Sequence, residues 1–351
     1  MPRTMLAARL HAPGDLRLEE VPVPEPGPGE VLVRVGACGI CASDVPRVLQ
    51  TGTYRFPLTP GHEFAGTVAA LGPGVTAWQL GDQVAVYPLL PCRRCPECRA
   101  ERYELCDDYD YLGSRRDGAF AAYVAAPAAN LVRVPEGVPL SDAATTEPVA
   151  VALHALHRYG TQAPETVAVW GAGLIGTVAA QWARALGAAR VWLVDILPER
   201  LEAARAVLEA ELVDGSKREA VEVLRQQTGG RGPELVVEAA GAPAATRQAL
   251  AAAAKSGHVV LLGNPSAEVT VPRPELSSVL RKQLTIHGSW NSAFWPDEAN
   301  EWRMALDAMA AGRIRVAPLI THRLPLAQAA EAFRMMGDRS EFFSKVMFVL
   351  D

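Results

Sequence analysis

Three residues between positions 38 and 63 have side chains that could hold a catalytic metal ion. They are Cys38, His62 and Glu63, and a thiolate, an imidazole and a carboxylate are all common zinc ligands. A catalytic zinc site needs three protein ligands and one open position, which this set provides. Ser43 lies nearby in the chain and offers a hydroxyl that could pass a proton. The alternative is that Cys38 and Cys41 form a redox C-x-x-C pair and that His62 is an ordinary loop residue.

A second group of candidate ligands follows, with the spacing C-x2-C-x2-C-x7-C. Its members are Cys92, Cys95, Cys98 and Cys106. Four thiolates with no histidine nearby favour a closed, tetrahedral structural zinc site. An iron–sulfur cluster is the main alternative, because closely spaced cysteines also bind clusters. The residues between these cysteines are mostly charged, which indicates a surface lobe rather than an apolar cluster pocket and favours zinc.

The segment 171–176, Gly-Ala-Gly-Leu-Ile-Gly, is typical of a loop that binds the pyrophosphate of a dinucleotide. It follows a short apolar strand at 167–170 and opens a helix, and the next strand, 191–194, ends at Asp195. This aspartate would accept hydrogen bonds from the adenosine ribose and repel a 2′-phosphate, which predicts NAD rather than NADP. An ordinary aspartate at a strand end is the alternative. The predicted cofactor contacts are Gly171, Gly173, Leu174, Ile175, Gly176 and Asp195.

Length and composition indicate a folded protein with about two domains. The chain has 351 residues, of which 49% are hydrophobic and 21% charged. A net charge of -5 argues against nucleic acid or an anionic membrane as a partner. The six cysteines, bunched between positions 38 and 106, are better metal ligands in a reducing compartment than disulfide partners. With no secretion signal in residues 1–10 and no membrane-spanning apolar run, we expect a cytoplasmic protein.

The elements that would position these motifs differ between the two halves of the chain. Short alternating runs between Pro- and Gly-rich turns in residues 1–90 predict a small β-barrel or sandwich. From residue 166 onwards strands and helices alternate, which predicts a doubly wound parallel sheet. Its further elements are expected as helices around 201–212 and 244–254 and strands at 235–238, 258–262 and 284–288. A helix at 302–311 and a strand at 345–350 are expected to pack back on the first domain.

These motifs, together with Gly61-His62-Glu63 and Glu147-Pro148, resemble those of the zinc-dependent medium-chain alcohol and polyol dehydrogenases from end to end of the chain. The likeness is closest to the branch that oxidises galactitol 1-phosphate, and it lies in residues 41–47, 88–92, 113–118 and 288–290. The resemblance implies a GroES-like, β-rich catalytic domain and a Rossmann domain that binds NAD. The domains are expected at 1–156 (catalytic), 157–290 (NAD-binding) and 291–351 (a segment returning to the catalytic domain).

The resemblance also implies the roles of the site residues. Cys38 and His62 would bind the catalytic zinc, with Glu63 and Glu147 as carboxylate ligands, and which glutamate is bound at a given stage stays open. Cys41 is left over as a small buried thiol. Two zinc ions per chain are expected, one catalytic and one structural. Zinc would lower the pKa of a secondary alcohol, Ser43 would accept its proton, and hydride would pass to NAD, leaving a ketone.

The expected substrate is a polyol phosphate, with galactitol 1-phosphate oxidised to a ketose phosphate. Arg115 and Arg116 lie in a Gly-bounded loop and could bind the phosphate bidentately, with Trp290 beside the polyol. Alternatively the two arginines are solvated or pair with nearby acidic residues, namely Asp107, Asp108, Asp110 or Asp117.

Two other functions stay open. One is the same chemistry on an unphosphorylated polyol or another secondary alcohol, such as sorbitol, L-iditol or threonine. The other is a catalytically inactive protein that senses NAD or uses zinc only structurally, and the presence of a full set of catalytic side chains argues against it. A homodimer or homotetramer is expected, because the apolar strand at 284–288 lies at a predicted sheet edge.

Overall fold

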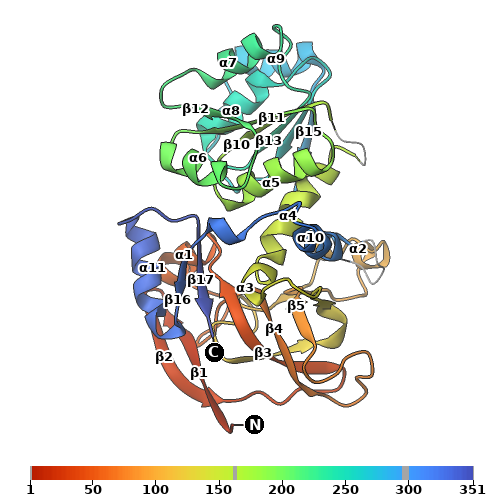
Figure 1. Ribbon diagram of the computed structural model, residues 1–351, viewed down its shortest axis with the longest axis vertical. Helices are drawn as coiled ribbons and strands as arrows, with labels where there is room; N and C mark the ends of the chain where they lie inside the picture. The colour runs from red at the N-terminus through yellow and green to blue at the C-terminus, as the bar shows by residue number, and fades with distance from the viewer. Residues whose placement is uncertain (1, 161–163, 295–299, 351) are drawn as a thin grey trace. The chain divides into compact units, whose positions relative to one another are not determined.

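Short apolar runs between Pro- and Gly-rich turns form a β-rich first unit (Figure 1). The computed structural model describes residues 2–160, 164–294 and 300–350. The first unit consists of Met1–Glu147, Ala293–Ala310 and Ile320–Asp351, and the second of Pro148–Ser292 and Ala311–Leu319. The units divide after Glu147 and after Ser292, whereas the expected positions were 156 and 290, and the short late segment Ala311–Leu319 belongs to the second unit.

A seven-stranded sheet is the centre of the first unit. Its order is β16-β17-β3-β4-β5-β9, with β8 also beside β3, and only the β16–β17 pair is parallel. The last strand of the chain thus pairs with β3, which also pairs with β4. The strands are β3 (Glu30–Gly39), β4 (Glu63–Leu71), β5 (Gln83–Val86), β8 (Tyr123–Pro127), β9 (Leu131–Arg133), β16 (Ile320–Leu324) and β17 (Lys345–Val349).

The hydrophobic core of this unit joins the start and the end of the chain. The Phe120 ring lies 5.9 Å from that of Phe333 on α11 and 5.0 Å from that of Phe348 on β17. The remaining strands of the unit are β1 (Thr4–Ala12), β2 (Asp15–Pro22), β6 (Leu89–Leu90) and β7 (Asp110–Tyr111). Its helices are α1 (Asp44–Pro46), α2 (Pro96–Arg99), α3 (Leu140–Ala143), α10 (Glu301–Ala310) and α11 (Ala329–Asp338), and α4 (Thr146–His157) begins here and continues into the second unit.

The second unit confirms the predicted doubly wound sheet. Its six strands are parallel and lie in the order β12-β11-β10-β13-β14-β15. The order reverses beside β10, where dinucleotides bind in sheets of this kind. The strands are β10 (Thr166–Trp170), β11 (Arg190–Asp195), β12 (Glu211–Asp214), β13 (Leu235–Glu238), β14 (His258–Leu261) and β15 (Thr285–Gly288). The helices are α5 (Leu174–Ala185), α6 (Pro198–Arg205), α7 (Ala220–Gln227), α8 (Pro243–Ala252) and α9 (Arg273–Lys282).

Two local predictions need correction. The helix expected at 201–212 ends at Arg205, because the chain enters the edge strand β12 at Glu211. Helix α9 was not predicted. It has Leu276, Val279 and Leu280 at helical spacing, but none of its residues is fully buried, and Val279 packs against the core of the second unit. Within the described ranges, no helix combines the length and the apolar character of a membrane-spanning segment.

Candidate metal and cofactor sites

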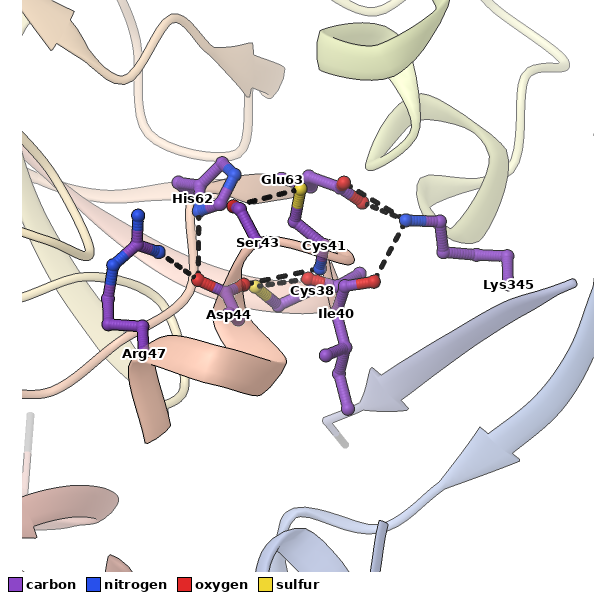
Figure 2. Close-up of polar contacts among 10 residues, drawn as sticks. Cys38, Ile40, Cys41, Ser43, Asp44, Arg47, His62, Glu63 and Lys345 are labelled. Atoms are coloured by element: carbon purple, nitrogen blue, oxygen red, sulfur yellow. Dashed lines mark hydrogen bonds and ion pairs between the residues drawn. The ribbon is translucent and has the colours of Figure 1, made fainter. Parts of the chain in front are cut away.

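Cys41 lies in the turn after β3, close to His62 and Glu63 at the start of β4 (Figure 2). The ligand atoms of these three residues all lie within 4.8 Å of one another. His62 and Glu63 are buried, whereas Cys41 is half-buried. Sulfur, nitrogen and oxygen donors this close together fit a zinc ion with one position open to a substrate.

Cys38, predicted to be the thiolate ligand, lies outside this group. It pairs with Phe64 of β4 and Phe348 of β17 in the middle of the sheet, and its side chain belongs to the hydrophobic core. Burial raises the pKa of its thiol well above the ordinary value, which disfavours a thiolate. The prediction that Cys38 is the ligand and Cys41 the buried thiol is therefore wrong. In the structure Cys41 faces the other candidate ligands and Cys38 is the buried thiol.

Asp44 lies beside the imidazole of His62. Its carboxylate is fully buried, accepts from the Cys41 backbone N–H (3.2 Å) and from Arg47 (2.5 Å), and lies 3.5 Å from His62 Nδ1. Burial opposes the charged carboxylate, but the nearby His62 and Arg47 keep the pKa of Asp44 below its usual value. With Nδ1 turned to Asp44, Nε2 is left for a metal, the usual arrangement of a histidine ligand oriented by a carboxylate.

Lys345, the first residue of β17, pairs with Glu63 inside the unit. Its ammonium lies 2.6 Å and 3.0 Å from the two carboxylate oxygens and donates to the Ile40 carbonyl at 3.0 Å (Figure 2). Lys345 is 5% exposed and Glu63 is 1% exposed. Burial disfavours the ammonium, but the neighbouring Glu63 raises the pKa of Lys345 above the ordinary value.

Glu147 and Ser43 flank the ligand group. Glu147 is buried in the first turn of α4, and this burial raises its pKa to about 7, with Glu63 adding to the effect and His62 opposing it. Glu147 is therefore close enough to influence the site, although its oxygens are outside the group of three. The Ser43 hydroxyl is exposed and donates to Cys41 Sγ at 3.2 Å.

The four later cysteines are brought together in one lobe. Cys92, Cys95, Cys98 and Cys106 have their sulfurs within 4.8 Å of one another. The Cys92–Cys98 and Cys95–Cys106 sulfurs are each 3.9 Å apart, close to the roughly 3.8 Å edge of a tetrahedron with Zn–S bonds of about 2.3 Å. A hydrogen bond from the Arg94 backbone lowers the pKa of Cys92 to about 6. The four sulfurs fit a structural zinc ion.

The glycine-rich loop lies between β10 and α5. Gly171 has φ +98°, and a Cβ at Gly176 would stand 1.8 Å from the Gly171 carbonyl oxygen, so both positions require glycine. Gly173 is the N-cap of α5, Leu174 is buried and Ile175 is half-buried. The free backbone N–H groups in this first turn can bind a pyrophosphate.

Asp195 lies at the carboxyl end of the neighbouring strand β11. It accepts hydrogen bonds from the backbone N–H groups of Ala172 (2.7 Å) and Leu197 (2.9 Å). Arg200 on α6 lies 3.8 Å from its carboxylate, a basic neighbour that the adjacent residues Ile196 and Leu197 did not predict.

The two arginines expected to bind the substrate have other contacts in the structure, and the expected third residue, Trp290, is exposed. Arg115 donates to the Tyr109 carbonyl (2.8 Å) and stacks on the rings of Tyr54 and Tyr109. Arg116 lies 3.6 Å from Asp110 and 3.7 Å from Glu30, and Trp290 is 58% exposed. None of the three belongs to the group of Cys41, His62 and Glu63.

Sequence reasoning missed Asp44 and Lys345. Asp44 follows Ser43 directly, so its position beside a candidate ligand turn was the available signal. Lys345 has no such signal, because its partner Glu63 is 282 residues away in the chain.

We expect the Lys345→Met substitution to destabilise the protein whose catalytic site is free of zinc by about 3–5 kcal/mol, because it leaves the buried Glu63 carboxylate without a positive partner. Denaturant titration measures this loss, and adding Glu63→Gln should restore most of it. The matched control is Lys217→Met, which removes an exposed pair with Asp214 (3.0 Å) and should cost less than about 1 kcal/mol. Equal losses in Lys345→Met and Lys217→Met would contradict the structural role of the buried pair.

Comparison with known protein families matches both units. Residues 27–136 match the alcohol dehydrogenase GroES-like domain, and residues 175–311 match the zinc-binding dehydrogenase domain. The chain is 35% identical to galactitol 1-phosphate 5-dehydrogenase of Escherichia coli, over 96% of this chain and 97% of that protein. It is also 35% identical to L-threonine 3-dehydrogenase of Symbiobacterium thermophilum (100% and 99% covered) and to human sorbitol dehydrogenase (93% and 91% covered).

Solved structures agree with these relationships. The galactitol-1-phosphate dehydrogenase of Escherichia coli superposes with a TM-score of 0.92 at 35% identity, covering 99% of this chain and 100% of that one. A zinc-binding dehydrogenase of Sinorhizobium meliloti bound to NADP gives a TM-score of 0.91 at 31% identity, with 99% and 100% covered. The chain therefore belongs to the zinc-dependent medium-chain alcohol and polyol dehydrogenases, oxidoreductases that use zinc and a nicotinamide dinucleotide.

Proposed function

We propose that this dehydrogenase oxidises a secondary alcohol of a polyol phosphate, with galactitol 1-phosphate as the preferred substrate and NAD as the hydride acceptor. The observation that carries the activity is the group of Cys41, His62 and Glu63, with the Ser43 hydroxyl beside it. The substrate is supported by similarity to the galactitol 1-phosphate enzyme, to which sorbitol and threonine dehydrogenases are equally close in identity. An unphosphorylated polyol or threonine is therefore the second candidate.

The residues of the site would have three roles in this reaction, which are metal binding, proton transfer and orientation of a metal ligand. Cys41 and His62 would hold the catalytic zinc, with Glu63 and Glu147 as the carboxylates that can complete the ligand set. Once bound, zinc would lower the pKa of the substrate hydroxyl, and a nicotinamide would accept the hydride. Ser43 is exposed beside Cys41, so its hydroxyl can accept the substrate proton and pass it to solvent. Asp44 keeps Nε2 of His62 directed at the metal.

We also propose that two or four copies of the chain assemble. β15 is the last strand in the order of the parallel sheet, and Ile286 on it is 45% exposed. An apolar strand at a sheet edge favours pairing with a second copy of the chain. The proposed enzyme is thus a cytoplasmic homodimer or homotetramer.

The two ligand groups predict two zinc ions per chain. Metal analysis of purified Cys41→Ala should find about one zinc, because a catalytic ligand is lost, whereas Cys38→Ala should keep both, because Cys38 packs in the core. Loss of zinc from Cys38→Ala together with full zinc in Cys41→Ala would return the ligand role to Cys38. Iron with visible absorbance at the four cysteines would refute the structural zinc site.

NAD should exceed NADP in kcat/KM by at least about tenfold, since the Asp195 carboxylate would repel a 2′-phosphate, and ~1.4 kcal/mol of repulsion is enough for that factor. Asp195→Ala should lose much of this preference, because Arg200 would then be free to meet the 2′-phosphate. The double substitution Asp195→Ala and Arg200→Ala is the control and should not gain activity with NADP. Equal use of both cofactors by the wild type would contradict the assignment.

The substrate is tested by following NADH absorbance with galactitol 1-phosphate, galactitol, sorbitol and threonine. We expect kcat/KM for galactitol 1-phosphate to exceed that for galactitol by at least about tenfold, because hydrogen bonds to a charged phosphate contribute roughly 1.5–3 kcal/mol. If kcat/KM for free galactitol or sorbitol equals that for galactitol 1-phosphate, an unphosphorylated polyol becomes the proposed substrate. If threonine alone is oxidised, the enzyme is a threonine dehydrogenase.

A further inference from the structure

A cavity of about 350 Å³ in the first unit is lined in part by three arginine side chains. Arg9 comes from β1, Arg55 from the loop before β4, and Arg116 from the loop before β8. None of the candidate zinc ligands lines this cavity. It is therefore a separate feature of the unit, and the proposed reaction does not account for it.

Of the three arginines, Arg9 has the fewest hydrogen-bond and ion-pair partners. The side chain is half-buried, and its Nε is buried with no hydrogen-bond partner. Its Nη2 donates to the Pro57 carbonyl at 3.3 Å, and no carboxylate within the described part of the chain forms an ion pair with it. A partly buried guanidinium without a counter-charge is unfavourable, so this position favours an anion.

The other two arginines add positive charge that acidic neighbours neutralise only in part. Arg55 lies 3.4 Å from Asp117, the one acidic residue lining the cavity, and Asp117 also accepts from the Thr59 backbone N–H at 2.9 Å. Arg116 forms ion pairs with Asp110 and Glu30 at 3.6 Å and 3.7 Å, and neither of these two carboxylates lines the cavity. Three cations therefore face one carboxylate in the lining, an excess that suits a phosphate group.

The rest of the lining is largely apolar. Met5, Val21, Leu112 and Val124 contribute hydrocarbon surface, and the volume exceeds what a single phosphate ion needs. We propose that this cavity binds a small phosphorylated metabolite, with its phosphate on Arg9, Arg55 and Arg116 and its carbon skeleton against the apolar side. The inference does not depend on which alcohol the enzyme oxidises.

Isothermal titration calorimetry of the full, zinc-loaded chain tests this site, with inorganic phosphate and glucose 6-phosphate as probes at constant ionic strength. We expect saturable binding of both probes and none of glucose. Arg9→Gln and Arg55→Gln should each weaken binding at least about tenfold, the effect of losing one charge-assisted hydrogen bond. Arg55 is 52% exposed on its side chain, so its variant tests the site even if Arg9→Gln fails to fold.

Arg133→Gln is the matched control, because Arg133 is equally exposed (51%) and also pairs with a carboxylate, Asp82, but lies outside the cavity. It should bind both probes as the wild type does. The proposal is overturned if neither probe shows saturable binding, or if Arg133→Gln weakens binding as much as Arg55→Gln. Loss of binding in His62→Ala, with Arg9→Gln and Arg55→Gln unaffected, would place the anion at the metal site and also overturn it.

Discussion

Charged side chains buried where β3, β4 and β17 meet determine the rest of the first unit. Glu63 and Lys345 are almost fully removed from water, and so is Asp44. Each of these charges would be costly alone, and removing one partner of such a pair costs several kcal/mol. Glu63 and Lys345 are 282 residues apart in the chain, so the carboxylate gains its partner only when β17 joins the sheet. The last strand of the chain thus completes the surroundings of the candidate zinc ligands.

The two contiguous motifs were the most predictable features. The glycine-rich loop lies between a strand and a helix, as its spacing indicates, and the four cysteines gather within one short lobe. Both depend on local backbone geometry that a few neighbouring residues specify. The parallel sheet was predictable for a similar reason, since strands buried on both faces are continuous apolar runs.

The features that the sequence did not predict depend on side-chain direction and on distant contacts. Cys38 and Cys41 are of the same residue type, and only their places, within β3 and in the turn after it, decide which one reaches His62. Arg200 approaches Asp195 because α6 begins directly after β11 and turns back towards it. Lys345 meets Glu63 through strand pairing across nearly the whole chain, which no local pattern records.

We propose that Cys41 and His62, and not Cys38, hold the catalytic metal beside the buried Glu63–Lys345 pair. The most direct measurement is an anomalous-difference map collected at the zinc absorption edge from crystals of the purified protein. We expect one peak among the four sulfurs of the cysteine lobe and a second between Cys41 Sγ and His62 Nε2, at bond lengths of about 2.3 Å and 2.0–2.1 Å. A second peak bound to Cys38, or no peak beside His62, would contradict it.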